Sequence, residues 1–249
     1  MNIFNDPAAL HLARGQEKPS PVESRTLESF ETIRAGVVDA PLNEIIPQTP
    51  GDHASALGFA LAWAMMASQG GMIFWAAPEQ DFFEDGLPNA EGLAQFGVPL
   101  DRLLLVRANS QLDALWATEQ ALATPGICAL CAITPTKKLL NLTATRRLLL
   151  TAEKYKTRCI LLRLDAAGAS AAWGRWRISS SPSQGLGHEL GLPSFMAKVE
   201  RNRKGPANLS FHLNWNIHDH VFQIANAMDG AIFSTATDRP VDAERRSAA

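Results

Sequence analysis

Residues 127–164 read ICALCAITPTKKLLNLTATRRLLLTAEKYKTRCILLRL. Two apolar runs, Ile127 to Ile133 and Cys159 to Leu164, flank a helical pattern from Thr143 to Tyr155. Short apolar runs without alternation are typical of strands that are buried on both faces of a parallel sheet. Parallel neighbours need a crossover connection, which a helix of this length supplies. The stretch therefore predicts a β-α-β unit.

The same alternation of strand and helix extends toward the N-terminus. Strands are predicted at Leu42 to Ile46, Met72 to Ala76 and Leu103 to Val106, and helices at Ser55 to Ala67, Glu91 to Phe96 and Leu112 to Ala123. After Leu164 the apolar residues alternate with polar ones in Trp176 to Ser180, Phe195 to Arg201 and Leu209 to Trp215. This change of period predicts a three-layer α/β domain with a mostly parallel central sheet and a C-terminal antiparallel hairpin at one edge.

Three segments are expected along the chain. Residues 1–31 lack a sustained apolar period and are interpreted as a flexible arm, residues 32–216 as the domain, and residues 217–249 as a tail. The apolar residues Phe222 and Ile224 lie in this tail, where they either dock on a partner or pack back on the domain. We expect the docking role, so that a chain ending at Asn216 keeps its fold.

The composition fits a globular domain with an uneven charge. The 249 residues are 46% apolar with a net charge of −2, which excludes disordered and collagen-like classes. Residues 1–134 contain 6 Lys and Arg against 16 Asp and Glu, whereas residues 135–206 contain 14 against 4. This polarity favours an anionic partner or the acidic half of a second copy, hence a homo-oligomer, unless folding interleaves the two halves.

The cysteine count and the hydropathy point to a cytoplasmic protein. Three cysteines and the absence of a leader pattern near Met1 favour a reducing compartment. The apolar stretch Ala54 to Ala67 is too short for a membrane span, which takes about 20 residues. We therefore expect no membrane contact.

A phosphate-binding loop is expected between the first strand and helix, but its key groups are missing. The segment holds Gly51, Asp52, His53 and Ser55, with one glycine and no lysine. Such a loop needs glycines around the phosphates and a lysine on the terminal ones, and Asp52 would repel a phosphate. The strand Ile127 to Ile133 also lacks a carboxylate for magnesium. The loop is interpreted as degenerate, with no cofactor and no catalytic residue.

Other reactive groups give weaker signals. Cys128 and Cys131 have redox spacing, but in a strand their sulfur atoms point to opposite faces. His212 and the pair His218 and His220 lack further ligands at metal-binding spacing, so no metal site is expected. A carboxylate group after the strand at 72–76 suits either acid/base chemistry or a solvated loop, and comprises Glu79, Asp81, Glu84 and Asp85.

Basic residues in the second half are the candidate contacts to DNA or to a partner. Arginine beside aromatic residues can bind phosphates and stack on bases, although such arginines also cover sheet edges. The candidates are Arg146, Arg147, Arg175, Trp176, Arg177, Arg201 and Arg203.

Several stretches carry motifs that can be compared with known families. Leu93 to Leu104, LAQFGVPLDRLL, resembles the "LGV..DNLL" stretch of RecA cores. The other motifs are Leu112 to Ala117, Leu142 to Leu148 with Ala152-Glu153, Ser170 to Ala172 with Arg175 to Ile178, and Arg201 to Pro206. Together these motifs resemble the ImuA family, RecA-like accessory proteins of bacterial SOS mutagenesis that are related to the cell-division inhibitor SulA.

The resemblance implies a RecA-like fold and a role without catalysis. It implies an adaptor for translesion synthesis that links an ImuB-type inactive Y-family polymerase with an error-prone C-family DNA polymerase. RecA and single-stranded DNA are further implied contacts, with association to the nucleoid after DNA damage. Two alternatives stay open: a SulA-like division inhibitor, and an NTPase with a divergent loop in which His53 and Glu79 replace the missing groups.

Overall fold

The computed structural model describes residues 39–133, 139–163, 168–183 and 191–225. These residues form a nine-stranded sheet with the order β3-β2-β4-β5-β1-β6-β7-β8-β9. The strands are β1 (Leu42–Pro47), β2 (Met72–Pro78), β3 (Leu103–Ala108), β4 (Ile127–Ile133), β5 (Arg158–Arg163), β6 (Gly174–Ser180), β7 (Ser194–Asn202), β8 (Leu209–Asn216) and β9 (Val221–Ile224). The expected arm at residues 1–31 lies outside the described residues.

The sheet has a parallel part and an antiparallel part. Strands β1 to β6 pair in parallel, and β6 to β9 form an antiparallel meander at one edge. The predicted fold class, mostly parallel with an antiparallel edge, is therefore confirmed. The meander extends beyond the predicted hairpin, because β9 adds a further strand.

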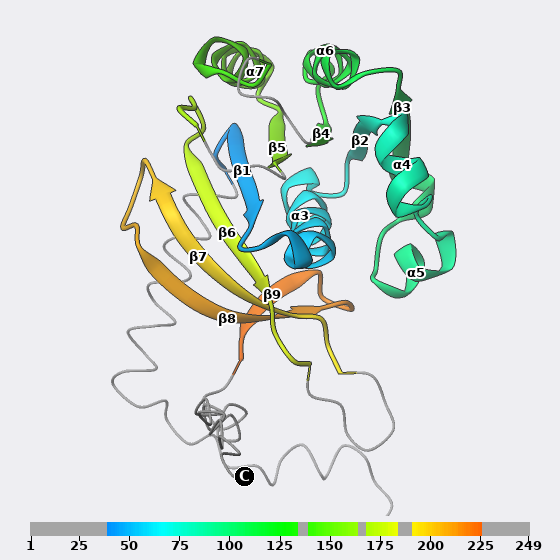
Figure 1. Cartoon of the computed structure of the whole chain (residues 1–249), viewed down its shortest axis with the longest axis vertical. Coiled ribbons are helices and arrows are strands. Elements are labelled where there is room, and N and C mark those ends of the chain that lie inside the picture. Colours follow the sequence, from blue (N-terminus) through cyan, green and yellow to red (C-terminus); the bar gives the residue numbers. More distant parts are fainter. Residues whose placement is uncertain (1–38, 134–138, 164–167, 184–190, 226–249) are drawn as a thin grey trace, which may run out of the picture.

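Helices cover the two faces of the parallel part (Figure 1). Helix α3 (His53–Ser68) packs on one face, and α6 (Gln111–Ala121) and α7 (Leu142–Tyr155) pack on the other. The remaining helical elements are short: η1 (Pro50–Asp52), α4 (Glu79–Asp85), α5 (Ala90–Gln95) and η2 (Leu100–Arg102). The acidic segment after β2, for which the sequence suits either acid/base chemistry or a solvated loop, forms the helix α4. None of the helices in the described ranges is long and apolar enough to cross a membrane.

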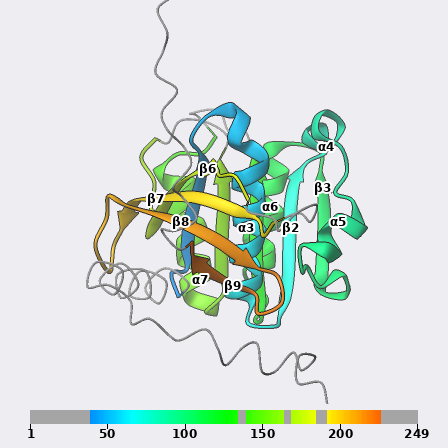
Figure 2. The same ribbon diagram turned by 90° about the horizontal axis from the view of Figure 1, so that it is seen from below.

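Aromatic residues make the core between α3 and the meander. Phe59 and Trp63 of α3 pack against Trp176 of β6, with ring centroids 5.8 and 5.2 Å away. Phe222 of β9 stacks on Phe59 at 4.7 Å, and Trp215 lies 5.1 Å from Phe222. Figure 2 shows the meander crossing beneath α3.

The prediction that the domain ends at residue 216 is therefore wrong. The first part of the predicted docking tail belongs to the domain, because it contains β9. Phe222 is only 4% exposed, and Ile224 packs against the same core. A turn at residues 217–220 reverses the chain, so that β9 pairs with β8 from Leu213 to Asn216. Four residues of strand suffice here because α3 already supplies an aromatic surface.

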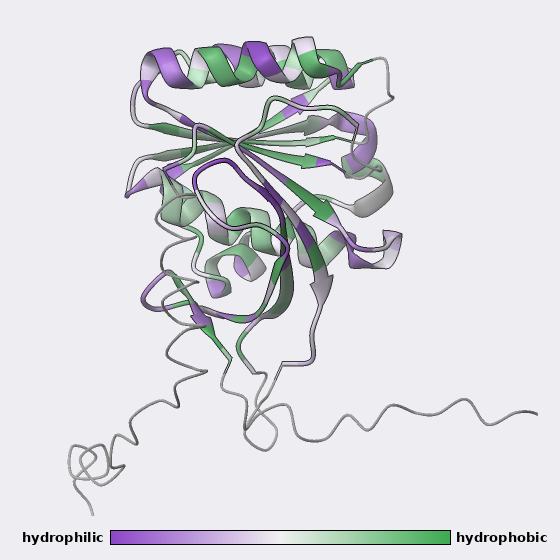
Figure 3. Ribbon diagram, turned by 90° about the vertical axis from the view of Figure 1, so that its left-hand side faces the viewer, coloured by the Kyte–Doolittle hydropathy of each residue, from purple (hydrophilic) through white to green (hydrophobic). Residues whose placement is uncertain are grey.

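The other face of the meander is polar. Arg175 and Arg177 of β6 alternate with core residues and lie on the face opposite α3, and Lys198 of β7 lies on that face as well. No helix of the described residues covers this part of the sheet (Figure 1). Hydrophobic residues are concentrated in the central strands (Figure 3).

Candidate functional site

The loop between β1 and α3 is held together by the side chain of Asp52. Its Oδ2 accepts hydrogen bonds from the Thr49 backbone N–H at 3.0 Å and the Thr49 hydroxyl at 2.7 Å. Its Oδ1 accepts from the Ser180 N–H at 2.8 Å and the Ser180 hydroxyl at 3.0 Å. The carboxylate therefore stands at the N-terminus of α3, where a phosphate-binding loop would hold its anion, and joins the loop to the end of β6.

These hydrogen bonds lower the pKa of Asp52, chiefly through the Ser180 backbone N–H. The stabilisation of the fold by the charged Asp52 is fully present above its unfolded pKa of 3.8. It is lost as the pH falls through the lower pKa that Asp52 has in the folded protein. We expect Asp52→Ala to lower the free energy of unfolding by about 1–3 kcal/mol at neutral pH, because the loop and strand donors lose their acceptor.

Urea unfolding of wild type and Asp52→Asn across acidic pH tests this expectation. The difference between the two proteins should shrink as the pH falls below 3.8. A difference that is independent of pH would show that the charge of Asp52 contributes nothing.

The other loop residues do not form a phosphate cradle. Gly51 has no protein neighbour closer than 3.7 Å to the position of a Cβ, so a side chain would fit there without a clash. His53 and Ser55 are half-buried in the first turn of α3. The loop carries no lysine. The geometry thus fits a structural turn.

A largely apolar hollow of about 310 Å³ lies beside α3 at the carboxyl ends of β2 and β4. His53 and Trp75 line it, and the strand ends contribute Ala77 and Ala132, where an NTPase would need carboxylates. Glu79 lines a neighbouring hollow instead and pairs with Arg107 at 3.6 Å. The two groups of the NTPase alternative, His53 and Glu79, therefore line different hollows.

The cysteine and histidine candidates are separated in space. Cys128 packs in the core on the α3 side and Cys131 in the core on the opposite side, and burial raises the pKa of each thiol to about 12. The Nε2 atom of His212 lies 2.8 Å from the hydroxyls of Ser181 and Ser194, whereas His220 stacks on a tryptophan ring. These positions give neither a dithiol pair nor a histidine cluster.

The prediction that Trp176 contacts DNA or a partner is wrong. Its side chain is 0% exposed and packs against Phe59 and Trp63. The Arg–Trp–Arg sequence places its two arginines on one face of β6 and its tryptophan on the other, because side chains alternate along a strand.

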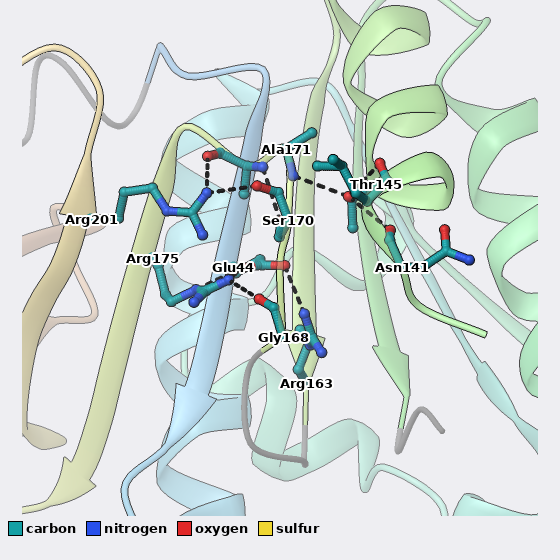
Figure 4. A network of polar contacts seen from close by, with 11 residues as sticks. Glu44, Asn141, Thr145, Arg163, Gly168, Ser170, Ala171, Arg175 and Arg201 are labelled. Atoms are coloured by element: carbon teal, nitrogen blue, oxygen red, sulfur yellow. Dashed lines mark hydrogen bonds and ion pairs between the residues drawn. The ribbon is translucent and has the colours of Figure 1, made fainter. Parts of the chain in front are cut away.

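Arg175 and Arg201 belong to an internal polar network (Figure 4). Glu44 of β1, which is 0% exposed, accepts from Arg163 at 3.2 Å and from Arg175 Nε at 2.9 Å. Arg175 also donates to the Gly168 carbonyl at 2.9 Å. Burial and the neighbouring Arg175 guanidinium lower the pKa of Arg201.

The network fixes the connection between β5 and β6, which runs without a helix among its described residues. Arg201 donates to the carbonyls of Ser170 at 2.7 Å and Ala172 at 3.1 Å, and the Ala171 N–H donates to Thr145 of α7 at 3.1 Å. Arg175 and Arg201 are therefore occupied in holding the fold. Arg177 similarly donates to Glu200 and to the Pro47 carbonyl.

The remaining predicted residues stay at the surface. Arg146 and Arg203 are exposed, and Arg147 is exposed while it pairs with Glu119 of α6 at 2.6 Å. Arg203 is followed by Lys204, whose Nζ lies 4.7 Å from the centre of the Trp173 ring. These residues fall into two separate places, one on α7 and one at the turn between β7 and β8.

Comparison with known proteins supports the family resemblance. No protein-family model matches the chain. Protein ImuA of Caulobacter vibrioides, in strain NA1000 / CB15N and in strain ATCC 19089 / CIP 103742 / CB 15, is 33% identical over 150 residues. The match covers 55% of this chain and 58% of the length of each ImuA. It confirms the resemblance to the ImuA family that the motifs predict.

One solved structure supports the fold, and a second is reported for comparison. The RadB recombinase aligns with a TM-score of 0.52 over 80% of this chain and 97% of its own, at 14% identity, which confirms the RecA-like architecture. SulA from Pseudomonas aeruginosa aligns with a TM-score of 0.41 over 51% of this chain and 99% of its own, at 20% identity.

Proposed function

We propose that this chain is a non-catalytic adaptor of the ImuA type in DNA-damage-induced translesion synthesis. It links an ImuB-type inactive Y-family polymerase with an error-prone C-family DNA polymerase. The similarity to ImuA and the RecA-like fold support an accessory role of this kind. The partners are inferred from the family resemblance, and the protein acts by binding near the nucleoid.

The observation that carries the absence of catalysis is the carboxylate of Asp52 in the loop. A nucleotide phosphate at the N-terminus of α3 would meet this anion, and no lysine is present in the loop to offset the repulsion. The strand ends at Ala77 and Ala132 offer no oxygen ligand for magnesium from their side chains. Both requirements of phosphoryl transfer, a phosphate cradle and a metal, are therefore unsupported here.

Contacts to single-stranded DNA are assigned to the turn after β7. Arg203 and Lys204 are exposed there, and the neighbouring Trp173 is half-buried. An arginine and a lysine beside an aromatic ring suit a phosphate and a stacked base. Arg175 and Arg177 are poor choices for a charge-reversal test, because their guanidinium groups hold the fold.

Pull-down with purified components tests the adaptor role. The full chain should capture the ImuB-type protein of its own organism, and the captured complex should retain the C-family polymerase. Addition of ATP and magnesium should leave the yield unchanged, because the proposed adaptor binds its partners without ATP. With single-stranded DNA present, ATP turnover should stay below about 1 per minute, against about 1–100 per second for kinases.

Two results would contradict this proposal. ATP turnover above that level and lost in Glu79→Gln would favour the NTPase alternative. Failure to capture the ImuB-type protein, with capture of the tubulin-like division protein instead, would favour a SulA-like inhibitor. A RecA protein assayed in parallel verifies that the ATPase assay works.

A further inference from the structure

Backbone hydrogen bonds connect four strand ends in a row at one end of the sheet. The strands β5, β1, β6 and β7 are consecutive neighbours, and the row joins the starts of the first three to the end of β7. The Cys159 N–H donates to the Pro41 carbonyl at 2.9 Å, and the Trp173 N–H donates to the Leu42 carbonyl at 2.9 Å. The Arg203 N–H then donates to the Trp173 carbonyl at 3.0 Å. Three steps between neighbouring strands span about 14 Å, so residues that are distant in the sequence lie close together here.

The turn between α7 and β5 lies at the same end of the sheet. Lys156 follows the last residue of α7 in a left-handed conformation with a φ of 55°, and it is exposed. Arg158 donates to the carbonyls of Lys156 at 3.3 Å and Thr157 at 3.4 Å. The guanidinium of Arg158 also pairs with Asp39 at 3.5 Å. Arg158 therefore holds the turn that carries Lys156.

The row and its adjoining turns form a surface that we call the basic rim, which comprises residues 39–42, 153–158, 173 and 203–206. Its sequence contains five Lys and Arg against two Asp and Glu. Of the two carboxylates, Asp39 is already paired in the turn after α7, and Glu153 lies on the last turn of α7. The ion pairs of the described residues leave Lys156, Arg203 and Lys204 without a carboxylate partner, and all three are exposed. The excess of positive charge favours an anionic partner.

Two aromatic rings lie in the basic rim, each with a lysine close to it. The Nζ of Lys204 is 4.7 Å from the centre of the Trp173 ring. The Nζ of Lys154 is 5.0 Å from the centre of the Tyr155 ring, and Tyr155 is 36% exposed. Trp173 packs against the core that α7 covers, so its side chain lies on the α7 side of the sheet. Both rings and the turn after α7 are therefore at one end and on one side of the sheet.

This combination of charge and rings favours single-stranded DNA over other anionic partners. The phosphates of a single strand bind cations, and its unpaired bases stack on aromatic side chains. In a duplex the faces of the bases are covered by their neighbours, so the rings would have no base to stack on. An acidic protein segment would match the cations but would make no use of the rings.

We propose that single-stranded DNA lies along the basic rim, with phosphates on Lys156 at one end and on Arg203 and Lys204 at the other. Bases between these phosphates stack on Tyr155 and Trp173. The rim contains the turn after β7, so the proposal rests on the proposed function there and extends the DNA contacts across four strand ends to the turn after α7. Because these contacts read no base edges, binding tolerates any sequence.

Fluorescence anisotropy with a labelled oligothymidine of about 15 nucleotides tests the proposal on the full chain. Lys156→Gln and Arg203→Gln each remove one phosphate contact, so each should lower the slope of log affinity against log salt by about 0.7. Relative to 1 M salt, that change makes binding about fivefold weaker at about 0.1 M. The double variant should lose about 1.4 in slope and bind about 25-fold more weakly.

A second probe tests the rings without any change to the protein. An abasic strand of the same length carries the same phosphates but no bases to stack. Wild type should bind it at least about fivefold more weakly than the oligothymidine, because stacking adds affinity for each base. Equal affinity for the two strands would overturn the proposal.

The matched control is Lys198→Gln, because this exposed lysine of β7 lies outside the basic rim. It should bind the oligothymidine as wild type does, and all variants should keep the wild-type circular dichroism spectrum. Weaker binding in Arg203→Gln but not in Lys156→Gln would confine DNA to the turn after β7 and overturn the extension along the rim. No binding of the oligothymidine by wild type would overturn the proposal as a whole.

The pull-down of the ImuB-type protein keeps this test separate from that of the adaptor role. Lys156→Gln and Arg203→Gln should capture the ImuB-type protein as wild type does, because the basic rim is assigned to DNA. Loss of DNA binding with intact capture supports the proposal. Loss of capture in the same variants would assign the rim to the protein partner and overturn it.

Discussion

Replacement of Glu44 by alanine is expected to lower the free energy of unfolding by about 3–5 kcal/mol. The Glu44 carboxylate is fully buried between Arg163, which is 1% exposed, and Arg175. Its removal takes from Arg163 and Arg175 the carboxylate with which both of them pair, and Arg163 is almost wholly buried. The penalty is the desolvation of these cations, which a buried pair offsets only when both partners are present.

Urea unfolding at neutral pH measures this effect. Glu119→Ala is the matched control, because it breaks an exposed pair with Arg147 and should cost about 1 kcal/mol or less. Glu44→Gln should also destabilise, since the amide keeps the shape but not the charge. A loss below about 1 kcal/mol for Glu44→Ala would mean that water or a rearranged side chain solvates the two arginines.

The sequence indicates the parallel half of the fold well, because each strand there is a nearly continuous apolar run. The run from Ile127 to Ile133 is β4 without any change of bounds, and α7 begins one residue before its predicted start at Thr143. Burial on both faces makes such strands distinct from their surroundings. Local composition therefore identifies them without knowledge of their neighbours.

The roles of the arginines are harder to predict from the sequence, because their ion-pair partners come from distant parts of the chain. Glu44 and Arg163 are 119 positions apart, and Arg175 meets Glu44 over 131 positions. A usable signal was present, however. A charged residue inside an apolar strand, as Glu44 is in LNEIIP, must be paired when it is buried.

The nucleotide loop shows the reverse case. The missing lysine and the presence of Asp52 indicate from sequence alone that a phosphate is disfavoured. The role of Asp52 as an acceptor for Ser180, 128 positions away, becomes visible only in the fold. The residue that disfavours a phosphate also fixes the loop to β6, so restoring a phosphate site by its removal would loosen the loop.

The strand β9 is the clearest case in which tertiary packing overrides a weak local signal. A segment of four residues, VFQI, reads as part of a polar tail. In the fold Phe222 contacts the rings of Phe59, Trp63, Phe195 and Trp215. This aromatic cluster joins α3 to the meander, so its loss affects elements that are distant in the sequence.

Phe222→Ala is therefore expected to lower the free energy of unfolding by about 3–5 kcal/mol, the range for a buried phenylalanine. A chain that ends at Asn216 should lose at least as much, because β9 leaves with the ring and exposes the edge of β8. Gln223→Ala is the matched control, since this neighbouring side chain is exposed and should change stability by about 0.5 kcal/mol or less. Thermal and urea unfolding of the three variants measure the effect. If the shortened chain kept the stability of the full one, β9 would be dispensable for the core, and the residues around Phe222 would again be candidates for docking on a partner.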